Sequence, residues 1–333
     1  MKTKLMIYGC GGTGLNLLQD VIDHPNLPTQ SPVDAVRIDL SNANERKDCP
    51  LPNYSIPGTG AGKDRALALE QTRPHIDDIL KQHLPGTNNI VLFSAAGGTG
   101  SVVGPLIIAE LLRRGHSVTA FVVGSTLTGK HCKNTHKTLL TLQQQVRNIK
   151  VPLALAYYEN AETETETGRK GNRPMVDKTI ANDIYRMSLL SSETHRELDR
   201  NDFKNFLDYR KVTDVPPQLT EIIFGVVGDE NANDFSAYQG SVISSVSVLR
   251  SKADTGPDLG QPYGAEGYYQ EEVVEEYGDK AHGQCAILTT LNLSTYMDNV
   301  LARLQHLEEV EENLKRDNGF RCDIASDDDD VLL

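Results

Sequence analysis

The chain has 333 residues, a formal net charge of −13, 38% hydrophobic residues and 24% charged residues. This length allows two cores of ordinary domain size, and the composition is typical of a globular protein in water. The negative charge disfavours direct binding to nucleic acid or to an anionic membrane. The apolar runs are too short for a membrane span or a secretory signal, so we expect a cytoplasmic protein. Its five scattered cysteines indicate neither a disulfide framework nor a zinc site.

The first half of the chain alternates short hydrophobic runs with helical patterns. The runs lack polar alternation, which is typical of parallel strands covered on both faces. We therefore predict a doubly wound, Rossmann-like α/β domain over residues 1–173. Its strands are expected at residues 4–8, 35–39, 89–95, 118–123 and 153–158, and its helices near 15–23, 63–83, 101–114 and 131–149.

The second half divides at a polar repeat and at a pair of prolines. A polar loop ends near residue 173, and a central helix from about Met175 to Ser191 begins the next segment, 174–211. Pro216 and Pro217 mark the start of a smaller α+β domain, residues 212–293. Its strands are expected at residues 219–227, 241–249 and 284–292.

The end of the chain reads as a long helix over residues 294–319 followed by an acidic tail, 320–333. Ser294 is the expected N-cap and Gly319 the expected stop. Apolar residues recur three or four apart along the helix, and we expect them to pack against the second domain, with a partner helix as the alternative. The acidic run from Asp323 to Asp330 is either a solvated tail or a docking segment.

Two glycine-rich loops each follow a predicted strand and open a helix. The first runs from Gly9 to Gly14 and the second from Ala95 to Ser101. Glycine lets main-chain N–H groups approach an anion, and the helix behind each loop adds about half a positive charge. The first loop alone fits a dinucleotide-binding pattern, with Asp39 placed to hold a ribose. A dinucleotide fold needs no second loop, so the pair favours a nucleoside triphosphate, and an NAD(P)-dependent oxidoreductase stays as the alternative.

A further segment, Gly124 to His131, nearly fits the P-loop pattern G-x-x-x-x-G-K-[ST]. His131 stands where the pattern has the hydroxyl that binds Mg²⁺. The segment also follows the fourth strand and not the first. We therefore do not expect it to form an independent phosphate site.

None of the glycine loops contains an obvious group to activate water for triphosphate hydrolysis. Asp199 and Asp202 stand three residues apart at the predicted start of a helix, so both carboxylates lie near one face of its first turn. They are candidates to orient the attacking water and to help hold a metal. The alternative is structural, with Asp199 as an N-cap and Asp202 stabilising the helix dipole.

The second loop, Gly97-Gly98-Thr99-Gly100-Ser101, resembles the G-G-T-G-[ST]-G signature of the tubulin/FtsZ superfamily, with Val102 in place of the last glycine. Further segments resemble that family in the same order over essentially the whole chain, although Lys178 replaces its base-stacking aromatic residue. The resemblance implies nucleotide-binding roles for Gly11, Gly12, Thr13, Asn16, Gly60, Ala61, Gly62, Lys63, Gly97, Gly98, Thr99, Gly100, Ser101, Asn160 and Asn182.

The same resemblance implies GTP or GDP and Mg²⁺ as cofactors. In the family, two acids three residues apart reach the nucleotide of the next subunit, which implies catalytic roles for Asp199 and Asp202 in a head-to-tail homopolymer. Such a contact does not close, so it makes an open filament. The ending is most similar to the phage tubulins, the PhuZ family, whose acidic tails dock on a neighbouring subunit. This implies a spindle that positions phage DNA in the host bacterial cytoplasm, and a non-hydrolysing structural filament protein is a further alternative.

Overall fold

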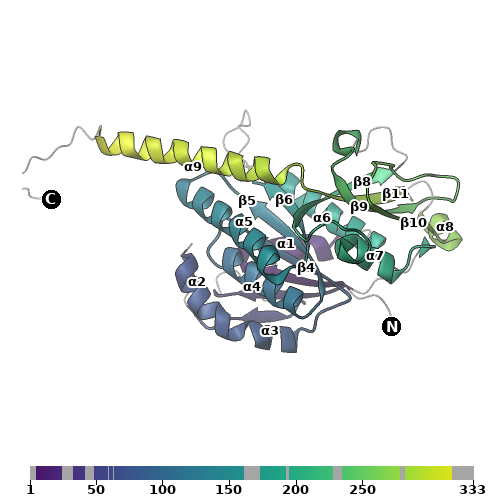
Figure 1. The fold of residues 1–333 in the computed structure, drawn as a ribbon. Helices are drawn as coiled ribbons and strands as arrows, with labels where there is room; N and C mark the ends of the chain where they lie inside the picture. Colours follow the sequence, from purple (N-terminus) through teal and green to yellow (C-terminus); the bar gives the residue numbers. More distant parts are fainter. Residues whose placement is uncertain are drawn as a thin grey trace, which may run out of the picture.

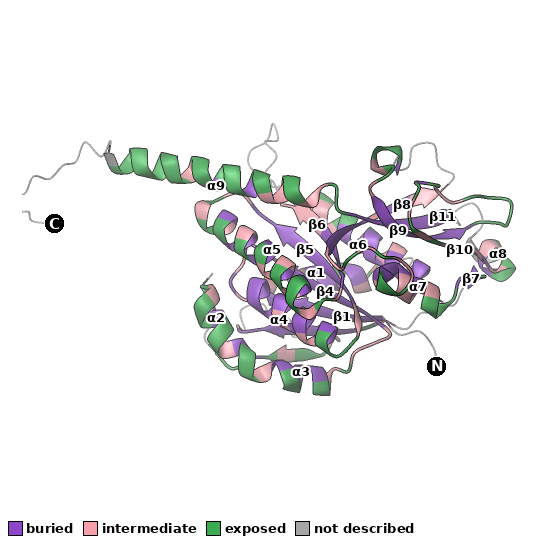
Figure 2. Cartoon of the chain, viewed as in Figure 1, coloured by how far each residue is buried: buried purple, intermediate pink, exposed green. Residues whose placement is uncertain are grey.

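The computed structural model describes residues 5–24, 33–41, 49–58, 60–62, 64–160, 173–192, 195–227, 235–277 and 282–316. Their strands form one 11-stranded sheet in the order β3-β2-β1-β4-β5-β6-β8-β11-β9-β10-β7 (Figure 1). Nearly all residues of the central strands are buried (Figure 2), as their continuous hydrophobic runs predict. No helix among the described residues is long and apolar enough to cross a membrane.

The strands of the first half are all parallel to their neighbours, which confirms the predicted α/β architecture. One face of the sheet packs on α1 and α6 and the other on α2 to α5. The strands are β1 (Leu5–Cys10), β2 (Val33–Asp39), β3 (Asn53–Ser55), β4 (Asn88–Ser94), β5 (Ser117–Gly124) and β6 (Leu153–Glu159). The helices are α1 (Gly11–Ile22), α2 (Arg65–Thr72), α3 (Ile76–Gln82), α4 (Gly100–Arg113) and α5 (Gly129–Ile149).

The single helix predicted over residues 63–83 is wrong. The helix α2 ends at Thr72, and a short 3₁₀ turn, η2 (Arg73–His75), leads into α3. Pro74 lies in that turn. Proline has no N–H to give to the preceding helical turn, so the regular hydrogen bonding of the helix is interrupted here.

The second half adds a mixed set of strands to the same sheet. The predicted strands at 219–227, 241–249 and 284–292 are confirmed as β8, β9 and β11, although β11 ends three residues early. Two strands were not predicted, β7 and β10. The elements are α6 (Arg173–Leu190), β7 (His195–Arg196), α7 (Arg200–Leu207), η3 (Tyr209–Lys211), β8 (Leu219–Val227), η4 (Phe235–Tyr238), β9 (Val242–Leu249), β10 (Tyr263–Tyr269), α8 (Glu271–Tyr277) and β11 (Gly283–Thr289).

The two halves of the sheet meet at a short junction. The strand β8 pairs in parallel with β6 only over Leu153–Leu155 and Leu219–Glu221. Beyond these residues β8 continues antiparallel to β11. The hydrogen-bonded sheet therefore runs through the expected boundary at residue 212, and the division into separate domains stays a prediction.

The last helix, α9 (Leu293–Arg316), begins one residue before Ser294, which is therefore not its N-cap. Its apolar stripe packs on α5 and not on the second half of the chain as expected: Val300 and Leu304 are buried against Cys132. Past this contact the helix projects beyond the body, and Leu314 is 64% exposed (Figures 1 and 2). Gly319 and the acidic tail, 320–333, lie outside the described residues.

A buried carboxylate holds the start of α9. Glu221, in β8, accepts hydrogen bonds from the Tyr296 hydroxyl at 2.6 Å and from Asn292 Nδ2 at 2.9 Å. Burial raises the pKa of Glu221, and these two hydrogen bonds partly oppose the shift. A raised folded-state pKa means that the ionised form is disfavoured, so this residue costs stability as the pH rises through that pKa.

We expect Tyr296→Phe to lower the free energy of unfolding by about 1–3 kcal/mol near neutral pH, because the buried carboxylate loses a donor. The loss should shrink as the pH is lowered, because more of Glu221 is then protonated in the folded state. Urea unfolding near neutral pH and at a more acidic pH measures it. Tyr268→Phe is the control, since its hydroxyl meets Glu197 at an exposed site. Equal losses at both pH values would contradict the assignment.

Candidate nucleotide-binding site

The two glycine loops meet at the carboxyl ends of β1 and β4, which are neighbours in the sheet. Together with the loop before α2 they enclose a cavity of about 330 Å³. The structure therefore brings the two glycine loops together with Gly60 to Gly62, to which the resemblance assigns nucleotide binding. The cavity wall consists of Cys10, Gly11, Gly12, Thr13, Asp39, Ser41, Gly60, Ala61, Gly62, Ser94, Gly97, Gly98, Thr99 and Gly100. Lys63 lies outside the described residues.

The helices α1 and α4 both point their amino ends into this cavity. Their N-cap residues, Cys10 and Thr99, make no capping hydrogen bond with their side chains. By contrast, Thr128 caps α5 by accepting from the N–H of His131. The first N–H groups of a helix have no partner inside it. Two uncapped helix ends that face one cavity suit an anion with several oxygens.

The carbonyl groups of the second loop are held away from the cavity by side chains. The Ser101 hydroxyl donates to the carbonyls of Gly97 and Gly98 at 2.6 and 3.0 Å. Asn134 of α5 donates to the carbonyls of Ala96 and Gly97 at 3.2 and 3.3 Å, and the Thr138 hydroxyl donates to that of Ala95 at 3.2 Å. These bonds hold the carbonyls of the loop in place, so Ser101 shapes the loop. Direct contact of its hydroxyl with a nucleotide stays a prediction.

Only glycine fits where the two loops touch. Gly11 has φ +68°, and a Cβ there would stand 2.7 Å from the main-chain nitrogen of Gly100. A Cβ on Gly100 would stand 2.8 Å from the carbonyl oxygen of Cys10. The backbones therefore pack directly on each other, and the cradle fits phosphate groups that approach main-chain N–H groups closely.

The third loop is turned by Gly60 at φ +84° and Gly62 at φ +50°. The side chain of Asp64 then caps α2 by accepting two main-chain hydrogen bonds. Lys130, from the segment that resembles a P-loop, donates to the carbonyl of Gly62 at 3.3 Å. This lysine therefore contacts the third loop, whereas the start of the helix that its own loop opens is capped by Thr128.

Asp39 is the carboxylate of the cavity wall, and it is only 4% exposed. Mg²⁺ binds beside phosphates through one or two carboxylates and several waters, so Asp39 with Ser41 fits that ion. No group of three metal-ligating side chains occurs among the described residues. The sequence interpretation gave Asp39 only a ribose role. Its position at the end of the strand next to β1 was the signal that it would face the phosphate loops.

The acid pair forms a reciprocal cap at the start of α7. The Asp199 carboxylate accepts from the N–H groups of Asn201 and Asp202 at 2.6 and 3.0 Å, and the Asp202 carboxylate accepts from the N–H of Asp199 at 2.9 Å. Asp199 is therefore the N-cap that the structural alternative proposed, and the catalytic role of the pair stays a prediction. Asp199 is exposed and Asp202 partly exposed, so water and a second molecule can reach both.

The acid pair and the cavity lie at opposite ends of the sheet. The helix α7 contacts β5. After burial and the charge of Arg114, the charge of Lys204 in α7 also lowers the pKa of His116, which directly precedes β5. The helix therefore lies near the amino end of that strand. The glycine loops instead follow the carboxyl ends of the strands. The 8 residues of β5 span about 25 Å. The acids therefore cannot meet the phosphate cavity of their own chain.

Two curated relatives place the chain in a family. A phage tubulin-like protein of Pseudomonas phage PhiPA3 is 30% identical over 224 residues, and one of Pseudomonas phage phiKZ is 28% identical over 235 residues. The matched regions are about two thirds of each chain: 66% of this one, and 66% and 68% of the relatives. The chain belongs to the phage tubulin-like proteins of the tubulin/FtsZ superfamily. No family model matches the sequence.

Solved structures show the phage tubulin fold over nearly the whole chain. The TubZ protofilament of bacteriophage PhiKZ superposes with a TM-score of 0.80 at 22% identity, covering 99% of this chain and 96% of that one. The phage tubulin PhuZ with GDP gives a TM-score of 0.79 at 20% identity, covering 99% and 95%. CetZ2 from Haloferax volcanii, in a protofilament with GTPγS, gives 0.66 at 13% identity, covering 92% and 99%.

Three residues to which the resemblance assigns nucleotide binding in this phage tubulin-like chain, Asn16, Asn160 and Asn182, are not part of the cavity wall. The Asn182 side-chain oxygen is hydrogen-bonded to His24 Nε2 at 3.0 Å, and the His24 ring stacks on Tyr185 at 4.9 Å. The N–H of Asn160 donates to the carbonyl of Gly124 at 3.0 Å. The roles of Asn16, Asn160 and Asn182 in nucleotide binding stay predictions.

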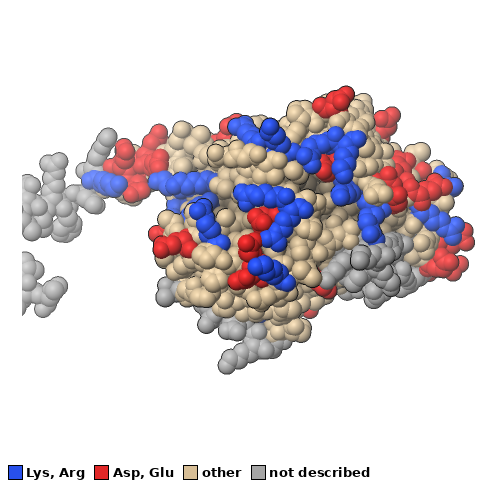
Figure 3. Space-filling model, turned by 60° about the horizontal axis from the view of Figure 1, so that its bottom comes forward, with Lys and Arg blue, Asp and Glu red and all other residues tan. Residues whose placement is uncertain are grey.

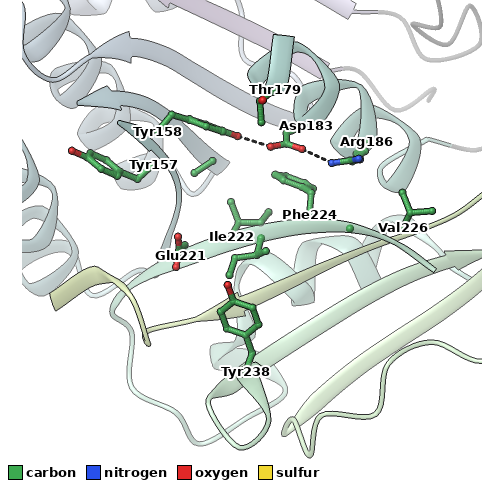
Figure 4. A pocket seen from close by; sticks show the side chains of 13 residues that line it. Tyr157, Tyr158, Thr179, Asp183, Arg186, Glu221, Ile222, Phe224, Val226 and Tyr238 are labelled. Atoms are coloured by element: carbon green, nitrogen blue, oxygen red, sulfur yellow. Dashed lines mark hydrogen bonds and ion pairs between the residues drawn. The ribbon is translucent and has the colours of Figure 1, made fainter. Parts of the chain in front are cut away.

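A second, polar cavity of about 470 Å³ lies where β6 and β8 diverge (Figure 4). Asp183 of α6 faces it and accepts from the Tyr158 hydroxyl at 2.9 Å and from Arg186 at 2.7 Å. Burial raises the pKa of Asp183, and the Arg186 cation opposes that shift. Asp183 directly follows Asn182, to which the resemblance assigns nucleotide binding, yet in this structure it faces the junction of the two half-sheets.

Proposed function

We propose that this phage tubulin-like chain binds GTP in the glycine-lined cavity and polymerises head to tail, with GTP hydrolysed where two copies meet. The observation that carries the proposal is the placement of the acid pair and the cavity at opposite ends of the same strands. Each chain then lacks a complete site, and a stack of copies completes one at every junction. The TubZ protofilament and the GDP-bound phage tubulin among the solved relatives support this assembly and this ligand.

Three groups of residues bind the phosphates, hold the metal and orient the water in the proposed reaction. The N–H groups at the start of α1 and α4 and the two helix dipoles hold the phosphates. Asp39 would help to hold Mg²⁺, which would supply positive charge to offset that of the phosphates. Asp199 and Asp202 of a second copy accept hydrogen bonds from that water and orient it. In the cell, we propose, the filaments position phage DNA in the host cytoplasm.

The helix α5 offers a surface for the acidic tail. Its sequence contains Lys130, Lys133, Lys137 and Arg147 and no Asp or Glu, in a chain whose net charge is −13. All four side chains are exposed. Figure 3 shows Lys and Arg side chains in a broken band across the middle of one face. We infer that the tail of one copy, Asp323 to Asp330, binds α5 of its neighbour through charge complementarity.

We expect deletion of residues 323–333 to raise the critical concentration for assembly about tenfold or more, because several ion pairs per junction are lost. Sedimentation with GTP over a range of protein concentrations measures it. In the full chain the critical concentration should also rise with salt, since exposed charges are screened within about 10 Å at 0.1 M. Unchanged assembly after the deletion would make the tail a passive end.

GTP turnover per subunit tests the proposed function directly. It should rise steeply with protein concentration, because the site forms only between copies. Light scattering with GTP, ATP and a slowly hydrolysed GTP analogue adds nucleotide choice and filament lifetime. Turnover per subunit that is independent of concentration would refute the shared site, and filaments whose lifetime ignores the nucleotide would favour a non-hydrolysing structural protein. NADH binding without GTP binding would restore the oxidoreductase alternative.

A further inference from the structure

Arg65 carries a positive charge into the protein beside the phosphate loops. It is the first residue of α2, directly after the third loop, and its guanidinium lies against the first turn of α4. Its Nη1 donates to the carbonyl of Ser101 at 2.7 Å and to the hydroxyl of Thr138. No carboxylate among the described residues forms an ion pair with it. Burial lowers the pKa of Arg65, but a guanidinium stays protonated in proteins.

The sequence of α4 explains why a donor is needed at this place. In a helix the carbonyl of Ser101 would accept from the N–H four residues later, but that residue is Pro105, which has no N–H. Arg65 supplies the missing hydrogen bond. A neutral donor would satisfy the carbonyl equally well, so the hydrogen bond alone does not account for a charged group. A cation taken out of water without a counter-charge is costly, and a nearby anion offsets that cost.

The contacts of Arg65 place its charge one layer behind the second glycine loop. Its two acceptors belong to the residues that fix that loop, since the Ser101 hydroxyl binds the carbonyls of Gly97 and Gly98 and Thr138 binds that of Ala95. Gly97 to Gly100 of the same loop line the cavity. Charges interact more strongly through the protein interior than through water, so the cation acts on an anion held there.

We propose that Arg65 is a positioning residue whose counter-charge is the bound polyphosphate. It ties α2, α4 and α5 together behind the loop, and its field makes affinity grow with each added phosphate. The inference rests on the proposed function, because it takes a guanine nucleotide as the ligand of the cavity. It adds a residue that discriminates GTP from ligands with fewer phosphates.

The test compares the affinities of Arg65→Gln and the wild-type full chain for GTP, GDP and guanosine, by calorimetry below the assembly threshold. Arg65→Gln should bind GTP about tenfold and GDP about threefold more weakly, and guanosine within about twofold of wild type. Arg114→Gln is the matched control. It removes a cation at the other end of α4, where Arg114 pairs with Glu110 and Asp77, and should leave all three affinities unchanged.

Arg65→Lys keeps the charge but loses the planar donor, so it should retain most of the ratio of GTP to guanosine affinity. If Arg65→Gln does not fold, Arg65→Lys alone tests the proposal. Its ratio of GTP to guanosine affinity either stays near the wild-type value, which supports the proposal, or falls, which contradicts it. An equal loss for all three ligands in Arg65→Gln, or a collapsed ratio in Arg65→Lys, would overturn the proposal and leave Arg65 a purely structural residue. Failure of the wild-type chain to bind GTP would instead refute the proposed function.

Discussion

Replacing Asp202 by asparagine is expected to lower GTP turnover by about 100-fold or more and to leave GTP affinity within about twofold of wild type. The carboxylate is lost, so the water at the junction is no longer oriented by a charged acceptor. An oxygen remains to accept from the N–H of Asp199, which preserves the cap of α7. Binding is spared because the cavity of the same chain lies at the far end of the sheet. Filaments should form and persist.

Turnover, sedimentation and nucleotide affinity of this variant should be measured on the same preparation. The control is Asp254→Asn, which changes an acid in a surface turn, where Asp254 accepts from the N–H and hydroxyl of Ser251. Normal turnover in Asp202→Asn would refute the catalytic assignment. Loss of both assembly and turnover would show instead that Asp202 is needed for the contact between copies and not for the chemistry.

The substitution Gly11→Ala should weaken GTP binding by about 100-fold or more, because it deforms the contact between the two phosphate loops. Gly11 has φ +68°, where a side chain costs about 1–2 kcal/mol. Its Cβ would also stand 2.7 Å from the main-chain nitrogen of Gly100. Neither loop can yield easily, because backbone lies on both sides. Calorimetry with GTP and thermal unfolding measure the two consequences.

Gly115→Ala is the control that separates the effect of backbone strain from that of the contact between the two loops. Gly115 has φ +76°, but nothing lies within 4 Å of the position that its Cβ would take. It should therefore lower stability by about 1–2 kcal/mol and leave GTP binding unchanged. Wild-type GTP affinity in Gly11→Ala would mean that the two loops do not form one site.

The sequence was sufficient for the strands that form the core of the fold. All five strands predicted in the first half are present, because parallel strands buried on both faces read as continuous apolar runs. The strand β10 was missed because its sequence, YGAEGYY, has two glycines, which are unfavourable in strands. Gly267 allows close packing, because a Cβ there would stand 2.6 Å from the carbonyl oxygen of Arg196 in β7, the strand that pairs antiparallel with β10. Only the folded chain reveals that contact.

The cavity that we propose to bind phosphates was predictable to the extent that main-chain groups form it. Glycines after a strand mark such loops, and the two that were predicted in this way meet at one cavity. The side chains that hold the second loop from behind, Asn134 and Thr138, carried no signal, because they are ordinary polar residues within a helix. The hydrogen bond from Arg65 to the carbonyl of Ser101 could not be predicted either, because it depends on Pro105 having no N–H for that carbonyl. Long-range contacts of this kind follow from tertiary packing and not from local pattern.

The distance between α7 and the glycine loops has a consequence for any stack of copies. At one tip of the stack, a nucleotide pocket opens to solvent with no carboxylates opposite it, and at the other tip a pair of carboxylates has no pocket to serve. The outermost triphosphate at the first tip is therefore spared until another copy arrives. The two tips of the proposed filament would therefore hydrolyse nucleotide at different times. The filament is polar because each monomer carries its pocket and its acid pair at opposite ends of its strands.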